Sequence, residues 1–284
     1  MSPHNRSGRE KPAAPAPLPL SVVDNHVHLD IARDGEQAPA VETAIAEAAA
    51  VGVSRMVQIG CDLPGARFTV EAIDSHRALL GGVALHPNEI PRLAASGGLD
   101  DAMAEIEELA NHPRVRVIGE TGLDYFRTGP DGIPAQQEAF RWHIDLAKRT
   151  GKTLQIHDRD AHADVLRILE EEGTPERTVL HCFSGDLPMA RLAVERGLML
   201  SFAGTVTFKN ASTLRNALSV APLEHLLVET DAPYLAPSPH RGATNASYLV
   251  PLTVRAMADV LNVDVPTLCA SLAANSERLY GSWS

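Results

Sequence analysis

Two histidines separated by one apolar residue stand near the start of the chain, in the segment 22–29 with the sequence VVDNHVHL. The β-branched residues and the alternation of this segment predict a short strand. Because side chains two apart on a strand share a face, His26 and His28 point the same way, close enough to bind one metal ion. Such a pair also fits two unrelated histidines on a wet strand face, so the other His, Glu and Asp residues decide between the two interpretations.

Short apolar segments alternate with segments of helical periodicity along the 284 residues of the chain. Eight predicted strands are rich in Val, Ile and Leu, namely 21–29, 55–60, 82–86, 115–120, 153–158, 178–183, 199–204 and 226–231. The predicted helices include 41–51, 134–149, 160–172, 248–262 and 266–278. This alternation predicts an α/β protein with parallel strands inside a layer of helices, and eight repeats at this length predict a closed (β/α)8 TIM barrel.

The charge of the chain limits how it can bind nucleic acid. Its formal net charge is −11, which excludes a general DNA-coating protein, because such proteins neutralise many phosphates with Lys and Arg. A local pocket in which metal ions supply the positive charge can still hold a nucleic-acid end. The three cysteines, Cys61, Cys182 and Cys269, are scattered without Cys-x-x-Cys spacing. They predict neither a disulfide framework nor a zinc ribbon, and they fit a reducing cytoplasmic location.

The first twenty residues differ in composition from the rest. They contain the proline-rich stretch PAAPAPLPL, which breaks any apolar helix and predicts a disordered tail over 1–20 and no signal peptide. Residues 21–284 then form a single barrel domain. No apolar run approaches the ~20 residues needed to span a membrane, so we expect no membrane partner, and we expect a monomer.

Potential metal ligands stand at the ends of the predicted strands. This position matters because the active site of such a barrel lies at the C-terminal mouth of its strands. The six residues are His26, His28, Glu120, His157, His181 and Asp231. Taken singly, each also fits an isolated polar residue or a helix N-cap; taken together, they are too many for one structural zinc and fit two divalent ions.

A carboxylate can bridge two cations, so Glu120 is the natural bridging ligand. The other ligands divide into His26, His28 and Asp231 for one ion and His157 and His181 for the second. Mixed imidazole and carboxylate donors suit Mg, Mn, Zn or Fe and do not choose among them.

Five ordered motifs make the chain similar to a known family: DNHVHLD at 24–30, GETGLDY at 119–125, IHDRDAH at 156–162, HCFSG at 181–185 and ETDAPYL at 229–235. They resemble the TatD family of metal-dependent deoxyribonucleases in the amidohydrolase superfamily. The resemblance covers nearly the whole chain after the tail. It implies an amidohydrolase-like TIM barrel, the six residues above as metal ligands, and Mg-dependent phosphodiester hydrolysis, including 3′–5′ exonuclease action on DNA and sometimes RNA.

The chain departs from the family pattern at two places. Asn88 stands where the family usually has a histidine, and the loop 241–247 lacks the Lys, second Arg, Glu and Pro of the family's corresponding loop. These departures leave the predicted ligands in place and put substrate contacts at that part of the rim in question.

The ligand set suggests a hydrolytic mechanism with Glu120 and Asp231 as catalytic residues. Two cations would clamp a scissile phosphate and activate a water molecule. Glu120 bridges the ions. Asp231, a ligand to one of them, is also placed to take the proton of the water.

Four further residues are candidates for binding or orienting the substrate. Arg159, two residues past His157, either binds phosphate oxygens bidentately or is a surface arginine at a helix end. His86 is either a phosphate contact or a structural histidine. Arg241 lies in a rim loop, and Asp124 either orients a ligand histidine or caps a turn.

Other residues with possible roles have a plain alternative. Tyr125 and Phe126 either stack a base or pack in the core. Strand alternation turns Cys182 away from the barrel interior, as a packing residue. The remaining histidines on helices and loops are expected to be exposed to solvent, namely His76, His112, His143, His162 and His225.

Three functions therefore compete. The first is a nuclease that acts on the ends of DNA and also, as an alternative substrate, of RNA. The second is a carbonyl hydrolase, such as a deacetylase or lactonase, because the same metal core polarises carbonyl oxygens. The third is a non-catalytic partner in quality control of exported proteins. Arg159 and the motifs favour the first, and an intact ligand set argues against the third.

Overall fold

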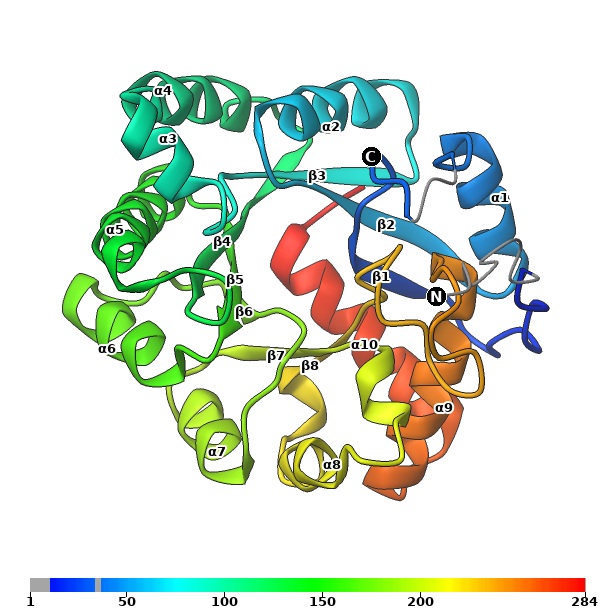
Figure 1. Ribbon diagram of the computed structural model, residues 1–284. Coiled ribbons are helices and arrows are strands. Elements are labelled where there is room, and N and C mark those ends of the chain that lie inside the picture. The colour runs from blue at the N-terminus through cyan, green and yellow to red at the C-terminus, as the bar shows by residue number, and fades with distance from the viewer. Residues whose placement is uncertain (1–10, 34–36, 284) are drawn as a thin grey trace, which may run out of the picture.

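Eight parallel strands form the centre of the computed structural model, which describes residues 11–33 and 37–283. They pair in sequence order from β1 to β8, and the helices surround them (Figure 1). The strands are β1 (Val22–Val27), β2 (Val53–Gly60), β3 (Leu79–Val83), β4 (Val115–Asp124), β5 (Thr153–Arg159), β6 (Thr178–Leu180), β7 (Met199–Phe202) and β8 (Leu226–Val228). The predicted (β/α)8 TIM barrel is confirmed.

Ten α-helices accompany these strands in the described part of the chain. They are α1 (Val41–Ala50), α2 (Leu63–Ser75), α3 (Ile90–Ser96), α4 (Leu99–Ala110), α5 (Ile133–Thr150), α6 (His162–Glu172), α7 (Leu187–Glu195), α8 (Ser212–Leu218), α9 (Val250–Leu261) and α10 (Val265–Tyr280). Short 3₁₀ turns are η1 (Pro130–Gly132), η2 (Gly204–Thr207), η3 (Leu223–His225) and η4 (Ser247–Leu249). No single described helix has the length and apolarity to cross a membrane; α9 with η4 and α10 pass that test only as a pair bent by 110°.

The ring of strands closes between β8 and β1. Val27 and Ala232 form a parallel bridge, and the His28 amide donates to the Ala232 carbonyl at 2.9 Å. The Asn25 side chain adds a hydrogen bond from its Nδ2 to the Val228 carbonyl, at 2.8 Å. Closure satisfies the backbone groups that an open sheet would leave unpaired at its edges.

Local sequence signals explain where several helices begin and end. Pro134 stands in the first turn of α5, and Gly151 ends that helix with φ 63°, in the positions that proline and glycine favour at helix ends. Asp62 caps α2 by accepting from the Gly65 amide at 2.7 Å. Asp160, the first residue of the predicted helix 160–172 and a plausible N-cap by its residue type, does not cap it, because α6 begins at His162 without a side-chain cap.

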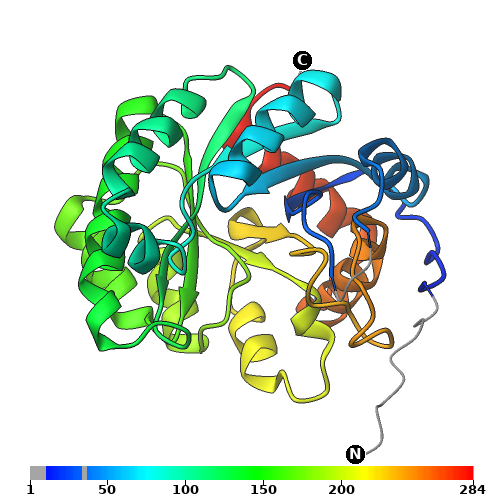
Figure 2. The same cartoon turned by 45° about the horizontal axis from the view of Figure 1, so that its top comes forward.

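The C-terminal helix closes one end of the barrel. Helix α10 lies across the middle of the ring of strands (Figures 1 and 2). The Leu279 carbonyl accepts from Thr153 Oγ1 at 3.0 Å, and Thr153 is the first residue of β5. The barrel interior at that end is packed with the side chains of Val23, Val57, Ile59, Leu80, Val117, Val179, Met199, Leu227, Leu279, Tyr280 and Trp283. The opposite, C-terminal end of the strands is therefore the open one.

Residues 11–20 differ from the predicted disordered tail, because they pack on the barrel. Leu18 is buried, and its amide donates to the Val51 carbonyl at 2.9 Å. Tyr248 donates its hydroxyl to the Pro12 carbonyl at 2.8 Å. These partners lie far along the chain, so the composition of the segment alone did not reveal them. The first half of the predicted tail lies outside the described residues.

The prediction of a solvent-exposed His143 is wrong. This side chain is fully buried in α5. Its Nδ1 faces the Ala139 carbonyl at 2.7 Å, and its Nε2 accepts from the Leu85 amide at 3.2 Å. Both contacts are satisfied by the neutral ring, and burial lowers the pKa of His143 from 6.5 to about 4. The other four histidines are partly buried, namely His76, His112, His162 and His225.

We predict that His143 makes the protein sensitive to acid. Between pH 6.5 and pH 4 the unfolded chain binds a proton that the native imidazole does not, so the stability it contributes is lost as the pH falls through this window. Urea unfolding should show that the free energy of unfolding falls by about 3 kcal/mol more in the wild type than in His143→Gln between pH 7 and pH 4. Parallel pH profiles for the two proteins would contradict this assignment.

Candidate metal centre

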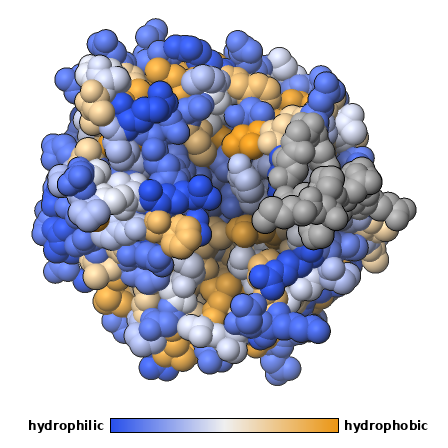
Figure 3. All heavy atoms as spheres, in the orientation of Figure 1, coloured by the Kyte–Doolittle hydropathy of each residue, from blue (hydrophilic) through white to orange (hydrophobic). Residues whose placement is uncertain are grey.

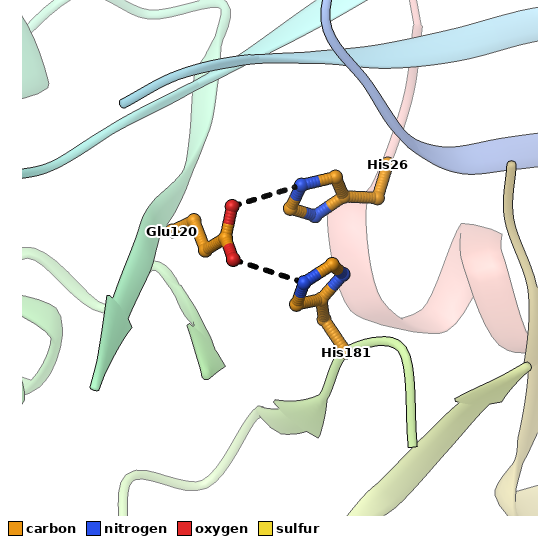
Figure 4. A group of neighbouring side chains, drawn as sticks. All are labelled: His26, Glu120 and His181. Atoms are coloured by element: carbon orange, nitrogen blue, oxygen red, sulfur yellow. Dashed lines mark hydrogen bonds and ion pairs between the residues drawn. The ribbon is translucent and has the colours of Figure 1, made fainter. Parts of the chain in front are cut away.

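The structure brings the six predicted ligands together at the open end of the barrel. His26 lies in β1, Glu120 in β4 and His157 in β5, whereas His28, His181 and Asp231 follow the ends of β1, β6 and β8. Figure 4 shows Glu120 facing His26 and His181 across the barrel. Their donor atoms, together with those of Cys61 and His86, form overlapping groups whose members lie within 4.8 Å of one another. Whether they ligate as assigned stays a prediction.

Irregular strand pairing aims two of these residues inward. The register between β1 and β2 shifts between Asp24 and Val27, the stretch that contains His26. The register between β4 and β5 shifts between Ile118 and Thr121, the stretch that contains Glu120. A bulge re-aims side chains locally and is common beside functional sites.

Glu120 lies at the centre of the cluster. Its Oε1 is 2.5 Å from His157 Nδ1 and 3.0 Å from His181 Nε2. Its Oε2 is 3.4 Å from His26 Nε2 and 3.8 Å from His28 Nε2. Although burial opposes ionisation, the neighbouring imidazoles hold the pKa of Glu120 well below its usual value. The two oxygens therefore face two separate groups of histidines, which is the arrangement a bridging carboxylate needs.

Asp231, which follows β8, completes the group that contains His26 and His28. Its Oδ1 lies 3.4 Å from His28 Nε2. Asp231 has a left-handed backbone, with φ 56°, which an aspartate tolerates better than most residues. Thr230, the residue before Asp231, is held by the buried carboxylate of Asp24. This carboxylate accepts hydrogen bonds from the amide and the hydroxyl of Thr230, at 2.9 and 2.6 Å.

Two neighbouring acceptors fix the tautomers of the first two histidines. His26 Nδ1 lies 2.7 Å from Gln155 Oε1, and the amide nitrogen of Gln155 donates to the Asn25 carbonyl at 2.9 Å. His28 Nδ1 lies 2.9 Å from the Ile59 carbonyl. Since both partners are acceptors, each Nδ1 carries the proton and each Nε2 presents a lone pair to the centre.

Glu229 fixes His181 in the same way. Its Oε1 lies 2.8 Å from His181 Nδ1, and its Oε2 accepts from Ser201 Oγ at 2.5 Å. Glu229 is fully buried; burial opposes its ionisation, but the charge of His181 and these hydrogen bonds lower its pKa. The Nε2 of His181 faces Glu120, and in the neutral ring it presents a lone pair to the centre.

These donors fit divalent cations. The lone pairs of His26 Nε2 and His28 Nε2 face one another at 3.2 Å, and that of His181 Nε2 faces a carboxylate oxygen at 3.0 Å. Lone pairs held this close repel one another unless a proton or a metal cation lies between them. The chain therefore has a cluster of His, Glu and Asp residues able to bind metal.

His157 has carboxylates on both sides of its ring. Its Nδ1 faces Glu120, and its Nε2 lies 3.2 Å from Asp124 Oδ2. Although burial disfavours the charged ring, these hydrogen bonds raise the pKa of His157 to about 9. Asp124 also accepts from the Arg127 amide at 2.9 Å, so both predicted roles occur in one side chain: it orients a histidine and caps a turn. Because Asp124 is buried, we expect it to position His157, and its contact with a substrate stays a prediction.

His86 lies at the edge of the cluster with a different protonation pattern. Its Nδ1 accepts from the Asn88 amide at 3.1 Å, so its Nε2 carries the proton in the neutral ring. That Nε2 lies 3.4 Å from Glu120 Oε1. His86 thus points an N–H group, and no lone pair, into the mouth, as a contact to an anion requires.

One cysteine, Cys61, lies closer to the cluster than the sequence interpretation allowed. Cys61 follows β2, with its Sγ 3.5 Å from Glu120 Oε2 and 3.8 Å from His28 Nδ1. Its position just past the end of a predicted strand was the sequence signal that could have placed Cys61 at the barrel mouth. The outward orientation expected for Cys182 stays a prediction; burial, and then the charge of Asp231, raise the pKa of its thiol.

Arginine and aromatic side chains form part of the rim. The Arg159 guanidinium lies over the Phe126 ring, 3.9 Å from its centroid, and Arg241 lies 4.5 Å from the Phe208 centroid. Tyr125 is partly buried and donates its hydroxyl to an Asp164 oxygen at 2.7 Å, so its role is packing.

Known proteins share this fold and sequence over nearly the whole chain. The family model described as TatD related DNase matches residues 23–281. An uncharacterized metal-dependent hydrolase TatD of Mycobacterium tuberculosis (strain H37Rv) is 47% identical over 264 residues, which are 92% of this chain and 98% of the relative. The uncharacterized metal-dependent hydrolase YcfH of Escherichia coli K12 is 36% identical over 262 residues, which are 92% and 96% of the two chains.

A solved structure has the same fold at lower identity. The TatD homologue YjjV of Escherichia coli superposes with a TM-score of 0.82 at 24% identity, over 92% of this chain and 98% of the other. With the family match and the two relatives, these findings establish that the chain belongs to the TatD family of metal-dependent hydrolases.

Proposed function

We propose that this hydrolase cleaves phosphodiester bonds at DNA ends, as a 3′–5′ exonuclease that uses two divalent ions (Mg, Mn or Zn) and also accepts RNA. The observation that carries the proposal is the Arg159 guanidinium beside the metal cluster. It follows His157 by two residues, stacks on Phe126 and forms no ion pair with a carboxylate of the described chain. An arginine so placed has its N–H donors available for phosphate oxygens.

A phosphodiester needs more positive partners than a carbonyl group does. Arg159 and the Nε2–H of His86 both lie at the mouth, and each can donate to a non-bridging phosphate oxygen. Divalent ions bound at the cluster would supply Lewis-acid polarisation of the phosphoryl group and acidify a water molecule. The two N–H donors beside the cluster favour phosphoryl over carbonyl substrates.

Asp231 is the acid best placed to move a proton. Its side chain is 16% exposed, whereas that of Glu120 is 5% exposed and that of His28 is 3% exposed. A general base must reach the nucleophile and return its proton to solvent. Glu120, enclosed by histidines, is suited to holding the cluster together.

We predict that metal binding stabilises the fold through Glu120. Protein stripped with a chelator should lose nuclease activity, regain it with Mg or Mn, and bind two ions per chain in calorimetry. A ligand at 100 times its Kd stabilises the native state by about 2.7 kcal/mol, so the thermal midpoint should rise on metal addition. The rise should disappear in Glu120→Gln and persist in Glu105→Gln, which alters a surface acid paired with Arg67. An unchanged rise in Glu120→Gln would contradict a bridging role.

We predict that Asp231→Asn lowers kcat on a 5′-labelled single strand by about 100-fold or more, because proton transfer typically contributes that much. Calorimetry on the same variant separates lost metal binding from lost proton transfer, since the amide oxygen remains a possible ligand. Full metal-dependent turnover in Asp231→Asn would refute the assignment. Ester and amide substrates assayed in parallel test the proposal itself, and faster turnover of these than of DNA would replace the nuclease by a carbonyl hydrolase.

A further inference from the structure

Basic side chains gather at the closed end of the barrel, which is the N-terminal end of the strands, where α10 lies. Figure 3 shows the opposite, open end, with hydrophilic residues around a central hollow. At the closed end, five cationic residues stand within two residues of the starts of β2, β3, β4 and β5, namely Arg55, Arg77, Arg114, Arg116 and Lys152. We call these residues the basic cluster. Like charges repel, so in a chain of formal net charge −11 their gathering at one end needs an explanation.

Carboxylates leave much of the basic cluster unneutralised. Three of its members form no ion pair with a carboxylate of the described residues, namely Arg55, Arg77 and Arg116. Burial, and next the charges of Arg77 and Arg116, hold the pKa of Arg114 below its usual value. Burial, and next the charge of Arg116, lower the pKa of Lys152 to about 8. These cations therefore lie close enough to repel one another, and a bound anion would relieve that repulsion.

Two buried N–H donors at this end of the barrel lack acceptors. Among the described residues, the buried side-chain N–H groups without a hydrogen-bond partner are Arg116 Nε and Trp283 Nε1. Trp283 is 5% exposed, and its carbonyl accepts from Arg114 Nη1 at 3.1 Å. Buried polar groups in native proteins nearly always have a partner. Two unpartnered donors at the same end therefore indicate an acceptor that the described part of the chain does not supply.

A cavity of about 270 Å³ lies at the closed end, between the starts of β1 and β2 and the end of α10. Arg55 and Trp283 line it together with Ser21, Ser54 and Glu277. The Arg55 guanidinium carbon lies 5.5 Å from the centroid of the Trp283 ring. A guanidinium stacked on an aromatic face keeps the N–H groups at its edge available to a ligand. The cavity thus places a cation without an ion-pair partner beside a buried indole N–H.

We propose that the closed end of the barrel binds a small phosphate-bearing anion, inorganic phosphate or a phosphate monoester, through Arg55, Arg116 and the indole N–H of Trp283. The fork of a guanidinium matches two phosphate oxygens, and a dianion offsets several neighbouring cations at once. A small anion fits better than an acidic protein segment, because the two unpartnered donors are buried. This site lies across the barrel from the metal centre and does not depend on the proposed nuclease function.

The fluorescence of Trp283 can report binding at this site. The chain has two tryptophans, Trp142 and Trp283, so Trp142→Phe leaves Trp283 as the single emitter. We expect a saturable fluorescence change when this variant is titrated with inorganic phosphate or with glycerol phosphate at constant ionic strength. In the same background, Arg55→Gln and Arg116→Gln should each raise Kd by about 10-fold, because each removes hydrogen bonds between a charged donor and the anion. The ligand with the lower Kd distinguishes the free ion from the monoester.

Two further variants separate a specific site from a defect in folding or a general effect of charge. Glu277→Gln removes a like charge from the cavity and should lower Kd by about 3-fold, a gain that misfolding cannot produce. Arg67→Gln removes a positive charge from a surface pair with Glu105 and should leave Kd unchanged. The proposal is overturned if neither phosphate ligand gives a saturable change, or if chloride at equal ionic strength gives the same change. An unaltered Kd in both Arg55→Gln and Arg116→Gln would also overturn it.

Discussion

The arrangement of lone pairs at the barrel mouth is the constraint on which the rest of the site depends. Three imidazoles direct Nε2 lone pairs inward because their Nδ1 protons are committed to Gln155, the Ile59 carbonyl and Glu229. Those partners only accept in these contacts, so the rings cannot relieve the repulsion by changing tautomer. The cluster is therefore preorganised to bind cations, because neighbouring residues already fix the orientation of its imidazole rings.

The barrel separates this constraint from the packing that stabilises the fold. Helix α10 fills the N-terminal end of the strands with apolar side chains, which leaves the C-terminal end free for polar groups. Gln155 connects the two halves. Its Oε1 contacts His26, and its Nε2 donates to the Asn25 carbonyl and to the Tyr280 hydroxyl, the latter at 3.3 Å. A side chain in the middle of the barrel thus links the C-terminal helix to His26, a predicted metal ligand.

Strand-end positions made much of the site predictable from sequence. His26 and Glu120 could be placed at the mouth because each belongs to an apolar strand, and parallel strands in a barrel end at one rim. The tautomer of His86 and the burial of His143 could not be predicted, because each depends on a hydrogen bond from a backbone amide that only the fold sets. The donor is the Asn88 amide for His86 and the Leu85 amide, far along the chain, for His143. Cys61 had the right position, but thiol spacing rules gave it no weight.

At the two places where the chain departs from the family pattern, Asn88 and the loop 241–247, local hydrogen bonds to residues around the cluster are present. Asn88, in place of a histidine, donates its Nδ2 to Asp124 at 3.1 Å and its amide to His86, so the orientation of His157 and the tautomer of His86 are kept. In the divergent loop, Asn245 still donates to the Thr230 carbonyl at 2.9 Å, next to Asp231. Asn88 and Asn245 thus both contact residues that hold the cluster, although they lie in the two segments that depart from the family pattern.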